Sequence, residues 1–327
     1  MKIKTDRISG ISAFITPKMR EHAVPGMAAA LISGGEIIHT ETAGCADPDK
    51  GIRITEDTHF EAASLTKPVF GRLVLKLASE GKLSLDSPIS EWYTSPVAFS
   101  DDPRFCEVTA RHVLSHSTGL PNWGECPLPL KFRPGFGFGY SGKGYTYLQN
   151  AVESIVGTRL DDILQREIFD PLDMDGAAMI WTSPLNRTLS RTFDENGTIE
   201  PLRSSCRHSV ALEPNAAFSL YVTIRDYPKF ILSVLSDREY TDMVKSTKNP
   251  AEAGVYWGLG WGLYKELIWH WGDNGGFKSL VMFDPDTQDG LLIHTNGFNG
   301  LRVCYALMSY LTDYDLDDIS LMISNAE

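Results

Sequence analysis

The chain has 327 residues, 43% of them hydrophobic and 22% charged, which is enough for one large core or two smaller ones. Its net charge at pH 7 is -12, and no basic cluster or stripe of basic and aromatic residues offsets it. Because an acidic surface repels phosphate backbones, nucleic acid is not expected as a partner. No stretch approaches the ~20 apolar residues of a membrane span, so no membrane partner is expected either.

The N-terminal segment and the cysteines predict a cytoplasmic protein. Charged residues between Asp6 and Glu21 interrupt the apolar run that a signal peptide needs. The cysteines are odd in number, far apart and without a C-x-x-C pair, which is typical of reduced thiols; they are Cys45, Cys106, Cys126, Cys206 and Cys304.

The first elements mix helix and strand signals. Isoleucines and a methionine at three- and four-residue spacing predict an amphipathic helix over residues 5–22. GMAAALIS and EIIHTETAG flank Gly34 and Gly35, which predicts a hairpin, and THFEAA is a further strand candidate. SLTKPVFGRLVLKLASEG returns to helical spacing, with Ser64 as the expected N-cap and Gly81 as the expected end.

The middle and the end of the chain differ in pattern. Loop-rich stretches alternate with helical segments up to about residue 250, including TARHVLSH, YTYLQNAVESIVG, DDILQREIF and AAFSLYVTIRDYPKFILSVL. Strand signals return in VYWGLGWGLYKE, LIWHWG, FKSLVMFDP and DGLLIHTNG, separated by turns as in an antiparallel meander, and LRVCYALMSYLTDY predicts a last helix. We therefore expect an α+β fold: an antiparallel sheet domain flanked by helices from residues 1–85 and 250–327, and an inserted mainly helical domain over 86–249.

Ser64 and Lys67 form an S-x-x-K arrangement at the predicted helix start. A serine hydroxyl needs a base beside it, and residues three apart at a helix start share one face, so Lys67 can reach Ser64. The helix N-terminus adds partial positive charge, and the Ser64 N–H can help to bind a developing oxyanion. A lysine can act as the base only if burial or nearby positive charge lowers its pKa toward neutrality; otherwise its role is to keep a second group anionic.

Three further segments accompany this motif. FEAASLTKPVFGRLVLKLASEGKLSLDSPISEW is followed by TARHVLSHSTGLP, FGYSGKGYTYLQNAVE and WHWGDNGGFKS. In order and spacing they resemble the nucleophile region, the Leu-x-x-His-x-Ser-Gly-Leu signature, the Tyr-x-Asn segment and the Lys-Thr-Gly or His-x-Gly strand of the serine β-lactamase and penicillin-binding-protein superfamily. The most similar branch is the class C β-lactamase-like group, with its esterases, D-aminopeptidases and D-alanyl carboxypeptidases.

The resemblance implies a β-lactamase/transpeptidase-like fold and a role for each matching residue. Ser64 would be the acylated nucleophile and Lys67 its partner. Tyr140 would be a second general base, since a tyrosine near a lysine and a histidine can lose its proton well below its usual pKa. His270 and Gly272 would lie on the strand at the edge of the cleft. The backbone N–H of Asp273 would complete the oxyanion hole with that of Ser64, and the side chains of Asp273 and Asn274 are weaker candidates for substrate contact.

Two positions depart from the family pattern. Gly142 stands where the Tyr-x-Asn element has asparagine, whose carboxamide is associated with holding a substrate's acylamide side chain. His270 replaces the usual lysine, which removes a fixed positive charge associated with recognition of the carboxylate of β-lactams and D-Ala-D-Ala ends. Both differences favour an esterase or a specialised amidase over a β-lactamase.

Other signals favour structural roles. Gly137, Gly142 and Lys143 imitate a phosphate-binding loop, but Gly144 replaces the required Ser or Thr and no apolar strand precedes the segment. His112 and His116 are spaced i, i+4 without the glutamate of H-E-x-x-H, so no metal or other cofactor is expected. Four tryptophans (Trp257, Trp261, Trp269 and Trp271) are typical of a sheet core, although Trp271 and Phe277 are candidates for lining an apolar acyl pocket.

The functional hypotheses fall into different classes. The preferred one is a serine hydrolase that forms an acyl-enzyme on Ser64 with small esters or with D-amino-acid or peptide-like amides. β-Lactamase or D-alanyl carboxypeptidase activity is the alternative within the same chemistry. A catalytically silent binding or sensor protein is the alternative outside it, and a P-loop nucleotide hydrolase is the least favoured.

Overall fold

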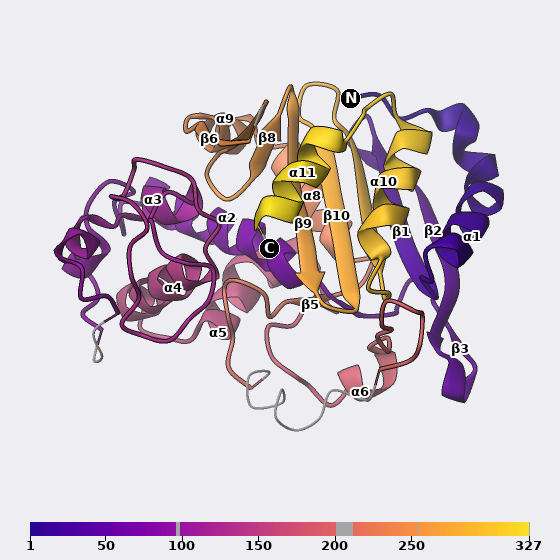
Figure 1. The fold of residues 1–327 in the computed structure, drawn as a ribbon, viewed down its shortest axis with the longest axis horizontal. Coiled ribbons are helices and arrows are strands. Elements are labelled where there is room, and N and C mark those ends of the chain that lie inside the picture. The colour runs from indigo at the N-terminus through magenta and orange to yellow at the C-terminus, as the bar shows by residue number, and fades with distance from the viewer. Residues whose placement is uncertain (96–98, 201–211, 253, 327) are drawn as a thin grey trace.

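The computed structural model describes residues 1–95, 99–200, 212–252 and 254–326, drawn in Figure 1. A nine-stranded antiparallel sheet forms its centre, in the order β3-β2-β1-β11-β10-β9-β8-β7-β6, and β4 and β5 form a separate pair. The strands are β1 (Gly26–Ser33), β2 (Glu36–Asp47), β3 (Ile52–Arg53), β4 (Phe60–Glu61), β5 (Tyr221–Val222), β6 (Asn249–Glu252), β7 (Val255–Trp257), β8 (Gly262–Tyr264), β9 (Leu267–Asn274), β10 (Phe277–Asp284) and β11 (Asp289–Thr295).

Helices lie on both faces of this sheet. The longer ones are α1 (Ile11–Glu21), α2 (Thr66–Ser79), α4 (Gly142–Val156), α8 (Tyr227–Leu235), α9 (Arg238–Lys245), α10 (Gly300–Leu311) and α11 (Asp317–Ala326). The shorter ones are α3 (Ala110–Leu114), α5 (Leu160–Leu164) and α6 (Leu185–Thr188). Short 3₁₀ helices are η1 (Thr5–Gly10), η2 (Pro48–Lys50), η3 (Ala63–Leu65), η4 (Ile89–Glu91), η5 (Pro103–Glu107) and η7 (Asp170–Leu172), and η6 (Gln165–Phe169) is a π-helical turn. None of the helices that the structure describes has the length and apolar character needed to cross a bilayer.

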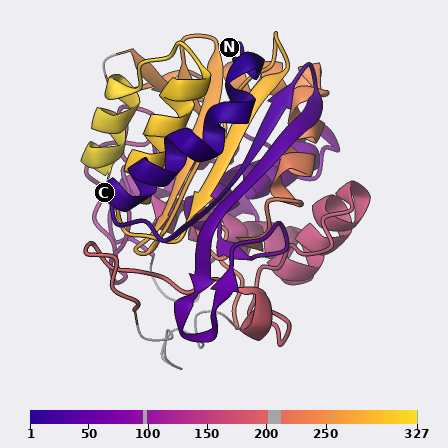
Figure 2. The same cartoon turned by 90° about the vertical axis from the view of Figure 1, so that its right-hand side faces the viewer.

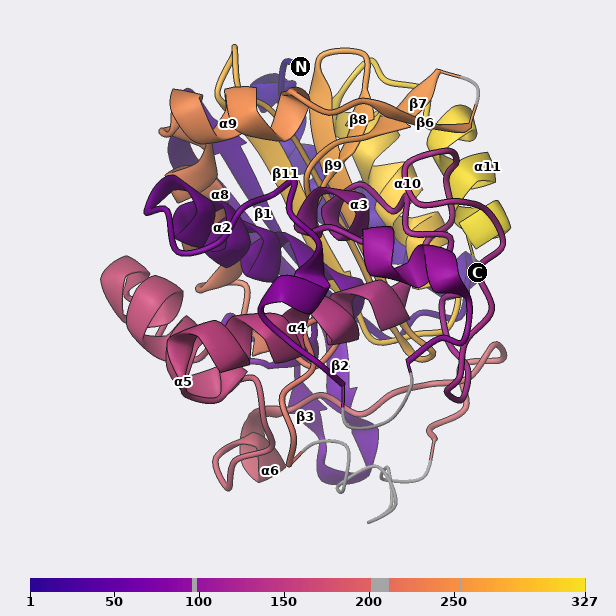
Figure 3. The ribbon, with the colours of Figure 1, turned by 90° about the vertical axis from the view of Figure 1, so that its left-hand side faces the viewer.

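The sheet separates two apolar cores because successive side chains of a strand point to opposite faces. On β1, Met27 belongs to the core under α1, α10 and α11, whereas Ala28 belongs to the core under α2 and α8. Figure 2 shows α1 lying across the first of these faces beside α10 and α11. Figure 3 shows the opposite side, where α2, α3, α4 and α5 stand in front of the sheet.

The predicted elements can now be compared with the observed ones. The hairpin at Gly34 and Gly35, the C-terminal strands and the α+β fold are confirmed. The first predicted helix divides into η1 and α1. The segment AAFSLYVTIRDYPKFILSVL is helical only in its second half, α8, because its first half supplies β5, which pairs with β4 in an antiparallel arrangement. Elements that the sequence did not predict include β3, β6, α6, α9 and α11.

All nine strands of the large sheet come from residues 26–53 and 249–295, and the described part of 86–249 contributes only the two-residue β5 and the first residue of β6 to any strand. The division into two domains at residues 85 and 249 stays a prediction. The four cysteines in the described residues form no disulfide, and Cys206 lies outside them.

Candidate active site

Ser64 lies on η3, a single turn between β4 and α2. It was expected to cap α2, but that prediction is wrong: α2 begins at Thr66, and the hydroxyl of Ser64 accepts a hydrogen bond from Lys67 instead of from the helix backbone. Ala63, just before it, has φ of 51°, a left-handed conformation that few residues other than glycine adopt. Such strain persists only where the surroundings impose it, and it is concentrated at functional sites.

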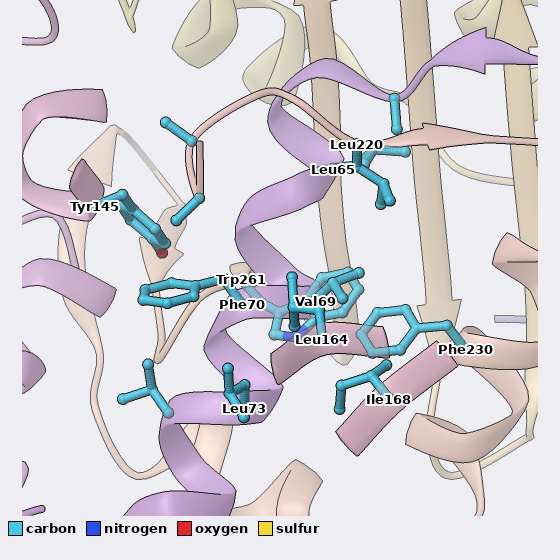
Figure 4. Packing of buried hydrophobic residues seen from close by; sticks show 14 of the residues in the cluster. Leu65, Val69, Phe70, Leu73, Tyr145, Leu164, Ile168, Leu220, Phe230 and Trp261 are labelled. Atoms are coloured by element: carbon cyan, nitrogen blue, oxygen red, sulfur yellow. The ribbon is translucent and has the colours of Figure 1, made fainter. Parts of the chain in front are cut away.

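Hydrogen bonds hold the strained turn in place from several sides. Thr66 Oγ1 donates to the Ala63 carbonyl at 2.7 Å and also accepts from the backbone N–H of Leu220 at 3.1 Å. The Tyr227 hydroxyl of α8 donates to the Leu65 carbonyl at 2.8 Å. Below the turn, the apolar side chains of α2 pack among those of α8 and neighbouring segments, as Figure 4 shows for Val69, Phe70, Leu73, Phe230 and Trp261. The nucleophile candidate therefore stands on a rigid base.

Lys67 points back from the first turn of α2 toward Ser64. Its Nζ donates to Ser64 Oγ at 2.9 Å and to the carbonyl of Ala217, also at 2.9 Å. The side chain is completely buried, and this loss of hydration lowers the pKa of Lys67 from 10.5 to about 7. At neutral pH a large fraction of Lys67 is thus an uncharged amine, within hydrogen-bonding distance of the hydroxyl whose proton a base would take.

Tyr140 comes from the loop before α4 and lies over the same amine. Its ring centroid is 4.8 Å from Lys67 Nζ, and the ring of Tyr145, from α4, is 5.5 Å away. Tyr140 itself is 8% exposed. The structure therefore brings Ser64, Lys67 and Tyr140 together, although Tyr140 lies 73 residues after Lys67 in the chain.

His116 holds the segment that carries Tyr140. Its ring lies against the Tyr140 ring, with centroids 4.2 Å apart, and its Nδ1 accepts from the backbone N–H of Ser141 at 3.1 Å. Burial, with the nearby charge of Lys67, holds the pKa of His116 well below 6.5. The ring is therefore neutral, and because Nδ1 accepts a hydrogen bond its single proton belongs on Nε2. His116 is a positioning residue.

β9 approaches η3 closely at Gly272. A Cβ on Gly272 would lie 2.3 Å from the Ala62 carbonyl oxygen, a contact that no side chain could make without moving the backbone. β8 pairs with β9 only as far as Trp269, so among the described strands none pairs with residues 270–274 on the side away from β10. The backbone at Gly272 and Asp273 thus reaches the nucleophile turn along an unpaired edge.

The side chains on this strand do not all take the places expected of them. His270 and Trp271 were expected at the substrate, but they are 0% and 2% exposed, and Trp271 packs against the Tyr140 ring at 4.7 Å. Their roles at the substrate stay predictions. Phe277, the other acyl-pocket candidate, is buried in the core beside Phe60. The remaining tryptophans, Trp257, Trp261 and Trp269, are buried as predicted.

Charge on this strand is compensated. Burial, together with the nearby charge of Lys67, lowers the pKa of His270 to about 3, so its ring is neutral; its Nδ1 donates to the Trp271 carbonyl at 2.7 Å. Lys278 on β10 pairs with the carboxylate of Asp273, which also accepts from the backbone N–H of Gly275 at 2.8 Å. Asn274 donates to Glu61 at 2.8 Å. The side chains of Asp273 and Asn274 thus bind groups of the protein itself, at the turn after β9 and on β10 and β4.

The structure gives the other motifs structural roles. His112 closes the capping box of α3 with Thr109. The glycine-rich segment ends in α4, where Gly142 is the first helical residue and Ser141 caps the helix by accepting from Gly144 N–H at 3.0 Å. In the described residues no group of three or more His, Cys, Asp or Glu side chains is arranged to hold a metal ion.

Sequence reasoning missed residues that support the site from far away in the chain. Ala217 offers a backbone carbonyl to Lys67 across 150 positions, and Gln149 of α4 places this segment by accepting from the Ala216 N–H at 2.8 Å. A backbone carbonyl leaves no trace in side-chain patterns. Tyr227 could have been noticed only as a tyrosine at the start of a mainly apolar helix.

An antiparallel sheet with helices on both faces and a Ser-x-x-Lys pair beside β9 is the arrangement that the motifs predicted for the serine β-lactamase and penicillin-binding-protein superfamily. Two solved structures share this fold over most of the chain. An octameric penicillin-binding protein homologue from Pyrococcus abyssi has a TM-score of 0.79 at 21% identity, covering 92% of this chain and 76% of that one. The D-alanine carboxypeptidase AmpC from Burkholderia cenocepacia has a TM-score of 0.78 at 17% identity, covering 94% and 99%.

The chain belongs to the Beta-lactamase family, whose model matches residues 11–308, and the resemblance seen in the motifs is thereby confirmed. The esterase EstB of Burkholderia gladioli is 28% identical over 207 residues, 53% of this chain and 52% of EstB. Protein flp of Staphylococcus aureus (strain NCTC 8325 / PS 47) is 20% identical over 327 residues, 90% of this chain and 64% of flp. The chain thus spans about half of the length of EstB and just under two thirds of the length of flp.

Proposed function

We propose that this protein is a serine hydrolase that forms an acyl-enzyme on Ser64 and acts on small esters or on D-amino-acid or peptide-like amides. The observation that carries the proposal is the 2.9 Å hydrogen bond from the buried amine of Lys67, with a pKa of about 7, to Ser64 Oγ. A structural role seldom requires a lysine whose charged form is so poorly stabilised. A general base does require one, because it must lose its proton near neutral pH.

In the proposed reaction, Ser64 Oγ attacks the carbonyl carbon while neutral Lys67 takes the hydroxyl proton. The carbonyl oxygen becomes an oxyanion, which the backbone N–H groups of Ser64 and Asp273 bind. The C–O or C–N bond then breaks, and the leaving alcohol or amine receives the proton from Lys67 or through Tyr140. A water molecule, deprotonated by the same groups, attacks the acyl-enzyme and releases the acid.

Charge favours neutral esters over β-lactams within this chemistry. A β-lactam or a peptide C-terminus carries a carboxylate that needs a positive partner. On β9, beside the nucleophile, His270 is neutral, and Lys278 on the neighbouring strand β10 is already paired with Asp273. The family's β-lactamase and carboxypeptidase activities stay the second candidate, supported by the likeness to the AmpC structure.

A labelling experiment and a substrate panel test the proposal. A fluorophosphonate probe should add its mass to the peptide that contains Ser64, and Ser64→Ala should abolish this adduct. The panel consists of p-nitrophenyl acetate and butyrate, a chromogenic cephalosporin and a D-alanine anilide, and we expect the esters to be turned over fastest. Absence of an adduct on folded wild-type protein would refute the mechanism, and an adduct without turnover of any substrate would favour a silent sensor. Dominant cephalosporin turnover would favour the second candidate.

A further inference from the structure

Gly142, where the family has an asparagine, is covered by an aromatic ring. A Cβ on Gly142 would lie 2.5 Å from Cη2 and 2.7 Å from Cζ2 of Trp123. The loop of Trp123 is fastened at this place: Gly142 N–H donates to Asn122 Oδ1 at 2.9 Å, and Lys143 N–H donates to the Asn122 carbonyl at 3.0 Å. The indole of Trp123 therefore occupies the space into which a side chain at position 142 would extend.

Trp123 meets a second aromatic residue from a distant segment. The rings of Trp123 and Phe218 pack edge to face, with centroids 5.6 Å apart at an angle of 77°. Trp123 is 49% exposed, so much of the indole remains open to solvent. A large apolar ring in such a position gains free energy when another apolar group covers it.

Both rings are attached to segments that contact the candidate base. Phe218 follows Ala217, whose carbonyl oxygen accepts from Lys67 Nζ, as does Ser64 Oγ. These two oxygens are therefore no more than two hydrogen-bond lengths apart. Trp123 covers Gly142, two residues after Tyr140, whose ring lies 4.8 Å from the same nitrogen. The two aromatic side chains thus bridge the two segments that flank Lys67.

We propose that Trp123 and Phe218 form the apolar wall that receives the acyl chain of the substrate, so that the site prefers apolar acyl groups of several carbons over acetyl. The inference rests on the proposed function, because it concerns the group attached to Ser64. The acyl chain remains at Ser64 after the alcohol has left, so a wall fixed beside Lys67 contacts it in both half-reactions. An asparagine at position 142 would present a polar carboxamide there, which can form hydrogen bonds with an amide group of the substrate. The indole of Trp123 presents an apolar surface instead, which favours contact with an alkyl chain.

Esters that share one leaving group and differ in acyl length test this proposal. For wild type, kcat/KM for p-nitrophenyl butyrate should exceed that for the acetate by about 10-fold or more, the lower end of what added methylenes contribute in an apolar pocket. Trp123→Ala and Phe218→Ala should each reduce this ratio at least about fivefold while the acetate rate changes little. Gly142→Ala should also reduce it, because the new Cβ displaces the indole without removing it.

Phe136→Ala is the matched control, because Phe136 is another exposed aromatic residue of the same loop region, 75% exposed. Its ratio should equal that of wild type. Labelling of Ser64 by the fluorophosphonate reports whether each variant is folded and competent; if Trp123→Ala does not fold, Phe218→Ala and Gly142→Ala decide the matter. If these variants are labelled normally and keep the wild-type ratio of butyrate to acetate kcat/KM, the inference about the acyl wall is overturned and the proposed function is not. No labelling of wild type would overturn the proposed function, and the inference with it.

Discussion

Replacing Lys67 with methionine should abolish acylation and yet make the folded protein more stable at pH 6. Burial lowers the pKa of Lys67 from 10.5 to about 7, and each pKa unit corresponds to about 1.4 kcal/mol, so the charged lysine costs up to about 5 kcal/mol in the folded state. The variant loses the hydrogen bonds to Ser64 and Ala217, about 1 kcal/mol each, and leaves the Ala217 carbonyl without this donor. The desolvation cost is the larger effect, and we expect a net gain of about 1 to 3 kcal/mol.

The gain should depend on pH in a definite direction. Between pH 7 and 10.5 the unfolded chain binds a proton at Lys67 that the folded protein does not, so the stability of wild type rises with pH in this window. Methionine does not titrate. The advantage of the variant should therefore shrink by about 2.5 kcal/mol between pH 6 and pH 9. For the same reason, kcat/KM of wild type should rise with pH through about 7, as Lys67 loses its proton.

Urea unfolding at pH 6 and pH 9 measures both effects, and fluorophosphonate labelling measures the loss of acylation. Lys76→Met is the control, because Lys76 lies on the same helix but its side chain is 39% exposed and pairs with Glu167 at the surface. Its effect should be within about 1 kcal/mol, with no change in labelling. A stability difference for Lys67→Met that is the same at both pH values would show that the pKa of Lys67 is not lowered, and would refute its role as the neutral base.

Three other substitutions test the remaining parts of the site. Tyr140→Phe keeps the ring over Lys67 and should slow acyl transfer by about 100-fold or more; a loss under threefold in the hydrolysis assay would remove its hydroxyl from proton transfer. Gly272→Ala places a Cβ 2.3 Å from the Ala62 carbonyl oxygen, so it should lower the free energy of unfolding in urea by about 1 to 3 kcal/mol and reduce labelling of Ser64. Unchanged stability and labelling would contradict the close approach. His116→Ala should lower kcat about 10-fold or more with a smaller change in KM, and an unchanged kcat would deny it a positioning role.

The sequence predicted the strands and the Ser64–Lys67 contact because both depend on local sequence pattern. Short apolar runs between turn residues, as at β1 and β9, indicate buried strands, and a spacing of three residues at a helix start indicates a shared face. The N-cap prediction for Ser64 was wrong for a local reason as well: the rule describes serines whose hydroxyl serves the helix backbone, whereas here the left-handed Ala63 inserts a turn before the helix and leaves that hydroxyl to Lys67.

Burial and long-range contacts were beyond sequence patterns. His270 and Trp271 stand at the expected place on β9, yet the pattern could not tell that both side chains are buried. Trp123 was passed over because it lies in a loop without periodicity. Its significance depends on Gly142 and Phe218, which are brought to it only when the chain folds.

The electrostatic features of the site depend on one another. Lys67 is a competent base only while its pKa stays near 7, and an anion placed beside it would raise that pKa and hold the proton on the amine. A substrate carboxylate would be such an anion unless a fixed cation compensated for it. Neutral His270 provides no such charge, and Lys278 is paired with Asp273. A site of this kind loses least of its basicity with a substrate that carries no charge near the scissile bond, and we therefore expect the burial that lowers the pKa of Lys67 to favour neutral esters in the proposed reaction.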